Sequence, residues 1–153
     1  MSEEIRISNM DPEQQIARYL RRLERERRRY MDAALVPLGL KGDMFMVLLT
    51  LSRHPGASQD MLAEHLMLDR GNMAKMAERL EKAGYISREP VEENRRQYAI
   101  NLTEKGMEAD DFIRAALKKW QSEITEGLSA DEKEQLRLVL GRMLDNVKNR
   151  GDK

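Results

Sequence analysis

The chain has 153 residues and no cysteine, and its 27 basic and 27 acidic residues give a formal net charge of zero. This balance argues against a generic polyanion binder, and the missing cysteine excludes disulfides and thiol-based redox sensing. No apolar run reaches the length of a membrane span and the N-terminus lacks an apolar signal region, so we expect a cytoplasmic protein. Aromatic residues make up only 5% and methionines number 11, which predicts a mainly α-helical fold with a core of Leu, Ala and Met.

The first predicted element is a long helix that begins at Asp11, an N-cap residue followed by Pro12 at the first helical position. It ends before Pro37 and Gly39. Seven arginines lie between residues 18 and 29. A solvated helix face is the interpretation we favour for them, and alignment with DNA phosphates is the alternative. The apolar side of this helix consists of Ile16, Leu20, Leu23, Met31, Ala34 and Leu35.

A second helix is predicted over residues 40–54, where Phe45, Leu48 and Leu49 are the expected buried contacts. Pro55 and Gly56 end it. We expect this helix to brace the two that follow, as the first helix of a three-helix core.

Residues 58–103 contain two short helical patterns and a hairpin. The first pattern begins at Ser58, an N-cap type residue, and the second runs from the N-cap Asp69 to a stop at Gly84. Two strands are predicted at 86–89 and 97–102, on either side of a charged loop at 90–96. Helix, turn, helix and β-hairpin in this order is the plan of a winged helix-turn-helix. The apolar positions of the two helices are Leu62, Ala63, Leu66, Met73, Met76, Ala77 and Leu80.

The opposite face of the second helix has side chains of the kinds that contact DNA bases. Arginine and asparagine make bidentate hydrogen bonds to guanine and adenine edges, and Gly71 and Ala74 let the backbone approach the groove. Two arginines in the hairpin suit a minor groove or its phosphates. For any one of these charges alone, solvation is the simpler explanation, but it does not explain the ordered set. The predicted DNA-binding residues are Ser58, Gln59, Arg70, Gly71, Asn72, Ala74, Lys75, Arg79, Arg95 and Arg96.

The charge of this segment is nearly balanced, with seven basic and eight acidic residues between Ser58 and Asn101. DNA affinity must therefore come from the placement of charge. Because non-specific affinity scales with the number of phosphates neutralised, we expect it to be weak at physiological salt.

A long helix is predicted from Thr103 to about Glu126, and a capping box over residues 129–132 opens the last helix. Together with the first helix, these two have more apolar surface than a small winged domain covers, so a partner is expected to cover it. The apolar positions are Met107, Phe112, Ala116, Leu117, Trp120, Ile124, Leu136, Val139, Leu140, Met143 and Val147.

These residues resemble the MarR-type (multiple antibiotic resistance) family of transcriptional regulators. The likeness lies in Leu62-Ala63, in the run from Leu80 to Arg88, and in Arg96 followed after five residues by Leu102-Thr103-Glu104-Lys105-Gly106. Asn94 stands where the family pattern has an aspartate. The resemblance implies a homodimer that interlocks the N- and C-terminal helices and binds a palindromic operator on double-stranded DNA, most simply as a repressor. The chain then divides into 11–38 and 104–150 for dimerisation and 40–103 for DNA binding.

The resemblance also implies a small apolar or aromatic effector, bound where the long helices meet the winged domain. Tyr30, Met44, Phe45 and Phe112 are the candidates for its pocket, with packing in the hydrophobic core as the alternative. The competing hypothesis for the whole chain is a winged-helix protein-interaction module without sequence-specific DNA binding. Asn94 and the near-neutral charge of the segment favour that alternative.

Catalytic and metal sites are not expected. His54 and His65 are the only histidines, and no residues show metal-ligand spacing. No phosphate-binding loop, nucleophile elbow or paired-carboxylate motif is present, so we predict neither an enzyme nor a cofactor.

Overall fold

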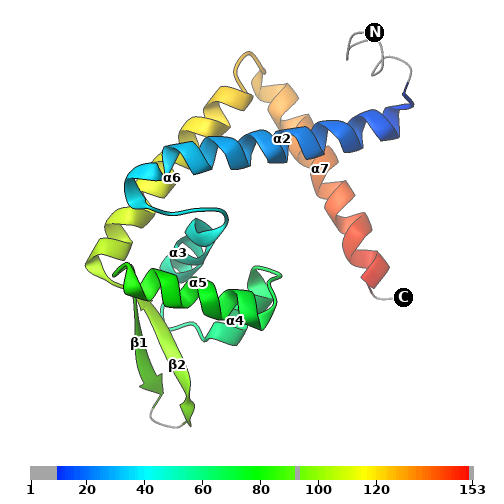
Figure 1. The fold of residues 1–153 in the computed structure, drawn as a ribbon. Coiled ribbons are helices and arrows are strands. Elements are labelled where there is room, and N and C mark those ends of the chain that lie inside the picture. The colour runs from blue at the N-terminus through cyan, green and yellow to red at the C-terminus, as the bar shows by residue number, and fades with distance from the viewer. Residues whose placement is uncertain (1–9, 92–93, 152–153) are drawn as a thin grey trace. The chain divides into compact units, whose positions relative to one another are not determined.

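The structure is a computed structural model that describes residues 10–91 and 94–151, with side chains described at all of these positions except 91, 94–97, 150 and 151. It is mainly helical with one antiparallel hairpin, as predicted (Figure 1). The chain forms two compact units that divide between Leu117 and Lys118, inside a continuous helix. None of the helices in the described ranges is long and apolar enough to cross a membrane. The elements are α2 (Pro12–Ala34), η1 (Val36–Leu38), α3 (Met44–Arg53), α4 (Gln59–His65), α5 (Arg70–Lys82), β1 (Ile86–Val91), β2 (Asn94–Leu102), α6 (Glu104–Ile124) and α7 (Ala130–Gly151).

Helix α2 begins as predicted, because the Asp11 carboxylate accepts a hydrogen bond from the Gln14 backbone N–H at 2.8 Å. Only its C-terminal part packs into the first unit. Met31 and the following Leu35 are 1% exposed, whereas Ile16 and Leu23 are 45% and 47% exposed. The N-terminal turns of α2 thus present an apolar side that nothing in this unit covers.

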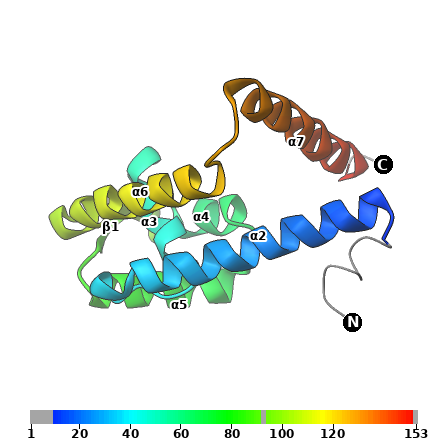
Figure 2. The ribbon, with the colours of Figure 1, turned by 90° about the horizontal axis from the view of Figure 1, so that it is seen from above.

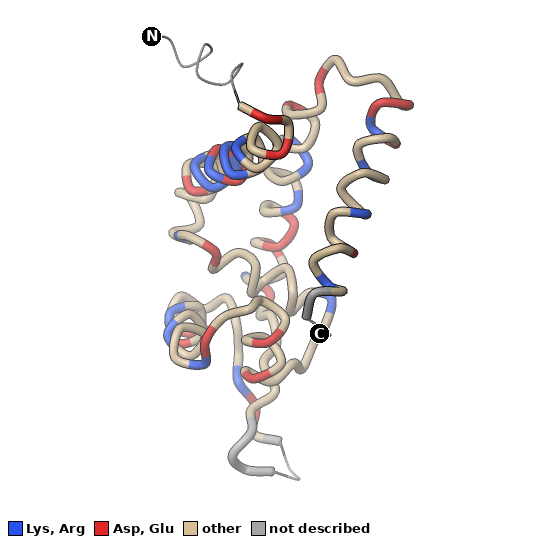
Figure 3. Tube along the Cα trace, turned by 90° about the vertical axis from the view of Figure 1, so that its right-hand side faces the viewer, with Lys and Arg blue, Asp and Glu red and all other residues tan. Residues whose placement is uncertain are grey.

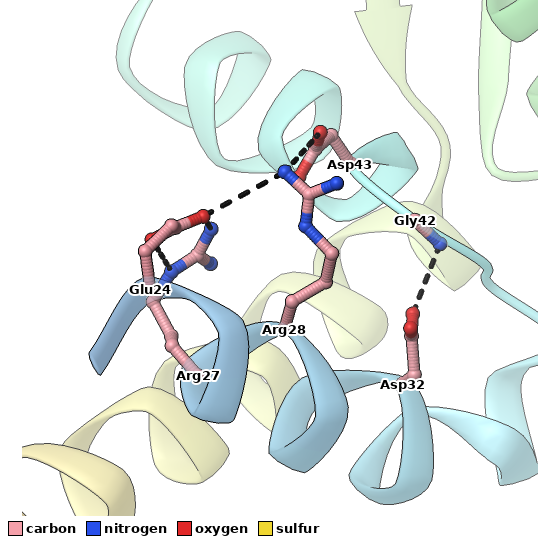
Figure 4. A network of polar contacts seen from close by, with 6 residues as sticks. All are labelled: Glu24, Arg27, Arg28, Asp32, Gly42 and Asp43. Carbon is pink, nitrogen blue, oxygen red and sulfur yellow. Dashed lines mark hydrogen bonds and ion pairs between the residues drawn. The ribbon is translucent and has the colours of Figure 1, made fainter. Parts of the chain in front are cut away.

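The start of the second helix was predicted too early, because α3 begins at Met44 and not at residue 40. Gly42 has φ 57°, a left-handed conformation that ends any helix running through it. The Gly42 N–H donates to the Asp32 carboxylate at 3.1 Å, which fixes this turn to α2. Arg28 lies 3.8 Å from Glu24 and 4.0 Å from Asp43, so it also links α2 to the turn (Figure 4).

Helix α3 is the centre of the first unit. Its residues Val47, Leu48 and Leu51 are at most 1% exposed, and Phe45 is 2% exposed. It lies between α2 and α5, and the hairpin extends from this unit on the side away from α2 (Figures 1 and 2). The bracing role predicted for this helix agrees with that position.

The two strands are longer than predicted. Residue pairs run from Ile86 opposite Leu102 to Pro90 opposite Tyr98, after which the register shifts and Val91 pairs with Asn94. Strand structure therefore includes most of the stretch predicted as a loop. The hairpin continues through a bulge, and a bulge leaves no simple alternation of side chains in the sequence.

The junction of α5, the wing and α6 is built around the backbone of Tyr85. Its carbonyl accepts the Thr103 N–H at 3.0 Å, and the Thr103 hydroxyl donates to the Gly84 carbonyl at 2.6 Å. Thr103 also caps α6, accepting the Gly106 N–H at 3.1 Å. A Cβ on Gly106 would lie 2.1 Å from the Tyr85 carbonyl oxygen, so this helix turn fits only because Gly106 has no side chain.

Helix α7 belongs to the second unit and begins with the predicted capping box. The Ser129 hydroxyl accepts the Glu132 N–H at 3.2 Å, and the Glu132 carboxylate accepts the Ser129 N–H at 2.8 Å. The bond from the Ser129 N–H favours the ionised carboxylate and lowers the pKa of Glu132.

We predict that Gly106→Ala destabilises the protein by about 3 kcal/mol or more, because the new methyl group must displace backbone and not a flexible side chain. The free energy of unfolding in urea measures it. Gly141→Ala is the matched control, since no heavy atom lies within 4 Å of its Cβ position and alanine favours a helix by about 1 kcal/mol. Equal free energies of unfolding for Gly106→Ala and the unsubstituted protein would contradict this account of the junction.

Candidate nucleic-acid interface

Helix α5 has one buried face and one exposed face. Met73, Ala77 and Leu80 are fully buried against the rest of the unit, which confirms the predicted apolar stripe. Ala74 is half-buried. The exposed face contains Arg70, Gly71, Asn72, Lys75, Glu78 and Arg79. The structure thus places the α5 residues predicted to contact DNA on one helix, and all of them except the half-buried Ala74 are exposed.

The N-terminus of α5 is held by Asp69. Its carboxylate accepts the Asn72 backbone N–H at 2.8 Å and also the Asn72 side-chain amide. The turn before it contains Met67, which is 93% exposed and adopts φ 52°, an uncommon conformation for a residue with a side chain. The cap therefore fixes both where the exposed face begins and the direction in which Asn72 points.

Not every cation on this face is equally available to a ligand. Arg70 lies 3.2 Å from Asp60 of α4, with both side chains mostly exposed. Neither Lys75 nor Arg79 forms an ion pair with a described residue within 4 Å. The Glu78 carboxylate accepts a hydrogen bond from Lys82 at 2.7 Å, which lowers the pKa of Glu78 and offsets its negative charge.

A groove of about 430 Å³ runs beside α5. Met44, Leu68 and Met76 supply apolar lining, and Lys75 and Arg79 supply positive charge. Lys41 and Asp43, from the turn that Asp32 and Arg28 hold, complete the lining with Asn72. Sequence reasoning missed Lys41 and Asp60, because only the packing of separate segments brings them close to α5.

The other predicted DNA-contacting residues are less completely defined. Ser58 caps α4, accepting the Met61 N–H at 3.2 Å, and Gln59 is the first residue of that helix. Both are half-buried. Arg95 and Arg96 belong to strand β2 near the end of the hairpin, but their side chains lie outside the described residues.

The four residues proposed for an effector pocket do not share one environment. Phe45 is a core residue, with the Arg27 guanidinium 5.8 Å from its ring centroid. Tyr30 packs against the core, and Phe112 is 43% exposed. Met44 belongs to the core as well, and it also lines the groove beside α5. Packing in the core, the alternative stated above, therefore describes Phe45 and Met44, with the partly buried Tyr30 against them.

Part of the arginine-rich face of α2 has a structural role. Lys and Arg positions follow one another closely along this helix in Figure 3. Arg27 hydrogen-bonds Glu24 at 2.6 and 2.8 Å, which lowers the pKa of Glu24, and the same arginine covers Phe45. Arg28 links α2 to Asp43 (Figure 4). We favoured a solvated helix face for the arginines of α2. Arg27 and Arg28 are in addition bonded to Glu24 and Asp43, so these two also have a structural role.

We predict that Asp69→Ala destabilises the protein by about 1 kcal/mol, because the first turn of α5 loses the acceptor for the Asn72 N–H. Asp69→Ser is the matched control, since its hydroxyl keeps the cap. The free energies of unfolding of the two variants measure the difference. The same free energy in both variants would show that the cap does not hold the start of α5.

Comparison with known proteins agrees with this geometry. The MarR family model matches residues 43–98, which span α3 to the wing. A crystal structure of MarR is 30% identical, and the match covers 95% of this chain and 99% of that one with a TM-score of 0.81. A MarR transcriptional regulator from Methanosarcina mazei Go1 is 25% identical, covering 88% and 96% of the two chains with a TM-score of 0.80.

The same fold occurs in a variant of MarR from E. coli that was solved in complex with operator DNA. It is 24% identical over 84% of this chain and 93% of that one, with a TM-score of 0.75. The full-length match at 30% identity and the order of α3, α4, α5 and the hairpin lead to one conclusion. The chain belongs to the MarR family of winged helix-turn-helix transcriptional regulators.

Proposed function

We propose that this protein is a sequence-specific regulator that binds a palindromic operator on double-stranded DNA as a homodimer, and that it acts as a repressor. The observation that carries the proposal is the exposed face of α5, where Asn72, Lys75 and Arg79 lie together on a capped helix. The E. coli protein that was solved in complex with operator DNA shares the fold, which supports DNA binding by this chain.

The residue types of this face suit the major groove. Arg70 and Lys75 donate to guanine O6 and N7, and the Asn72 amide pairs with adenine N6 and N7. The absence of a side chain at Gly71 and the small one at Ala74 let the helix come close to the bases. Arg79 is one turn further along and contacts a phosphate in this arrangement, because long cationic side chains reach the DNA backbone beside the groove.

The balance of charge favours specific over non-specific binding. Asp60 lies beside Arg70 and offsets part of its attraction to phosphates. Binding without sequence selection is weakened by such acids, since it depends on net neutralisation of phosphates. A correct operator recovers affinity through base contacts that orient Arg70 and Asn72.

We predict that Lys75→Ala weakens operator binding by about 1–3 kcal/mol, as expected for loss of a base contact, and relaxes selection at one position. Arg79→Ala should weaken all duplexes alike and reduce the slope of log affinity against log salt by about one. Binding isotherms at several salt concentrations measure both effects.

Lys118→Ala is the control for these substitutions. Lys118 is exposed and belongs to the other compact unit, so the account expects no change in affinity. Unchanged operator affinity in Lys75→Ala and Arg79→Ala alike would favour the interaction-module alternative.

The homodimer is inferred from uncovered apolar surface. On α7, Leu136 is 45% and Val147 is 68% exposed, and both lie on one helical face with Leu140 and Met143. Ile16 on α2 is similarly exposed. A symmetric pair of chains covers such stripes and presents two α5 helices to successive major grooves, about 10–10.5 base pairs apart.

We predict that Val147→Asp shifts the protein from dimer to monomer, because the interface would bury an unpaired carboxylate. Asn149→Asp is the matched control, with the same new charge on the opposite face of α7. Sedimentation velocity of both variants gives the oligomeric state. Two variants that both remain dimeric, or both become monomeric, would contradict the assignment of this face to the interface.

The proposal includes a response to a small ligand bound in the groove beside α5. The groove beside α5 joins apolar lining to Lys75 and Arg79, so a ligand with an apolar body and an anionic group fits its chemistry. Such a ligand would occupy the same cations as DNA and lower operator affinity. Equal operator affinity with and without a ligand that is known to bind in this groove would contradict the proposed ligand response.

A further inference from the structure

The only two histidines of the chain lie close together, at the C-terminal ends of α3 and α4. His54 caps the C-terminus of α3, and His65 is the last residue of α4. Their ring centroids are 5.8 Å apart and the ring planes meet at 63°, an edge-to-face contact. Both side chains are exposed to solvent. This pair takes no part in the proposed DNA contacts.

We propose that His54 and His65 form a two-histidine binding site for one divalent transition-metal ion of the zinc, nickel and copper type. A zinc–nitrogen bond is about 2.0–2.1 Å long, so two imidazoles that share a tetrahedral ion have ring centres about 5 Å apart. The observed separation exceeds this by less than 1 Å. Rotation of two exposed side chains closes the difference without moving a helix.

The backbone around His54 is held firmly. Its N–H donates to the Thr50 carbonyl at 2.9 Å, and its carbonyl accepts the Ala57 N–H at 3.3 Å. The next turn is fixed to the wing, because the Gly56 N–H donates to the Ile100 carbonyl and the Ile100 N–H donates to the Ala57 carbonyl, both at 3.0 Å. His54 thus projects from a turn that is attached to a helix and to a strand.

His65 is held from the other side by the core. Leu62 and Ala63, in the same turn of α4, are 0% and 4% exposed. Two imidazoles on anchored backbones lose little freedom when one ion binds both, so the second bond forms with a high effective concentration. This preorganisation distinguishes the pair from two unrelated surface histidines.

The donor set determines which ions fit. Imidazole nitrogen suits zinc, copper and nickel, whereas magnesium and calcium require oxygen ligands. No group of three or more His, Cys, Asp or Glu gathers anywhere in the described residues, so water completes the coordination. An ion held by both rings connects the end of α3 to the end of α4 and stabilises the folded helix-turn-helix by mass action.

The test uses the full-length chain without a histidine tag, because a tag would bind the same ions. Zinc and nickel are titrated by calorimetry into the unsubstituted protein, His54→Gln, His65→Gln and the double variant, with magnesium as the control ion. Each single variant should bind about a hundredfold more weakly than the unsubstituted protein, and the double variant should also lose the weak binding that one imidazole retains. Unfolding in metal-free buffer shows that all four proteins are folded.

Two further outcomes decide the proposal. Bound copper should show coupling to two nitrogens in its electron paramagnetic resonance spectrum, and to one nitrogen in either single variant. Single variants that each lose only about half of the binding capacity would indicate two independent histidines and would overturn the shared site. Equal metal affinity in the unsubstituted protein and the double variant would also overturn it.

Discussion

The contact between the start of α6 and the backbone of Tyr85 is the constraint on which the DNA-binding unit depends. Gly106 allows α6 to lie against the Tyr85 carbonyl, and Thr103 bonds to both Gly84 and Tyr85 while it caps the helix. The Tyr85 hydroxyl donates to the Leu38 carbonyl at 2.6 Å, and burial raises the pKa of this phenol. One residue therefore joins the end of α5, the wing, α6 and the segment after α2. The direction of the exposed face of α5 follows from this junction.

The proposed recognition of DNA relies on where charges lie and not on how many there are. The segment from Ser58 to Asn101 is nearly neutral, yet Lys75 and Arg79 lie on the exposed face without an ion pair to a described residue. Acids that lie close by are paired in specific ways, Asp60 with Arg70 and Glu78 with Lys82. Such pairing weakens attraction to arbitrary DNA and leaves base-edge contacts to provide the affinity for an operator.

Local signals in the sequence predicted the elements whose ends are set by a single residue. Asp11, Ser58, Asp69 and Thr103 cap helices as expected, because N-caps act over three residues. The predicted start of α3 was wrong. The left-handed conformation of Gly42 and its hydrogen bond to Asp32 of α2 prevent a helix there, although the sequence pattern favours one.

Contacts between separate segments could not be predicted from the sequence, because they depend on how those segments pack in the folded chain. The extent of the strands depends on a bulge in the pairing of Pro90 and Val91 with β2. The closeness of Asp60 to Arg70 depends on how α4 packs against α5, and that of His54 to His65 depends on where the folded chain places the ends of α3 and α4. The exposure of the α5 face could be predicted from the sequence, because a single helix supplies its residues. The burial of Phe45 could not, because it depends on how separate helices pack.

The central claim is that two copies of the α5 face read a symmetric DNA site. Its most direct test is selection of binding sequences from a library of random duplexes at two salt concentrations, followed by sequencing of the retained DNA. The account predicts a palindrome whose half-sites are about 10–10.5 base pairs apart and which is still selected at the higher salt concentration. Retention without enrichment of any sequence, or only at low salt, would contradict it.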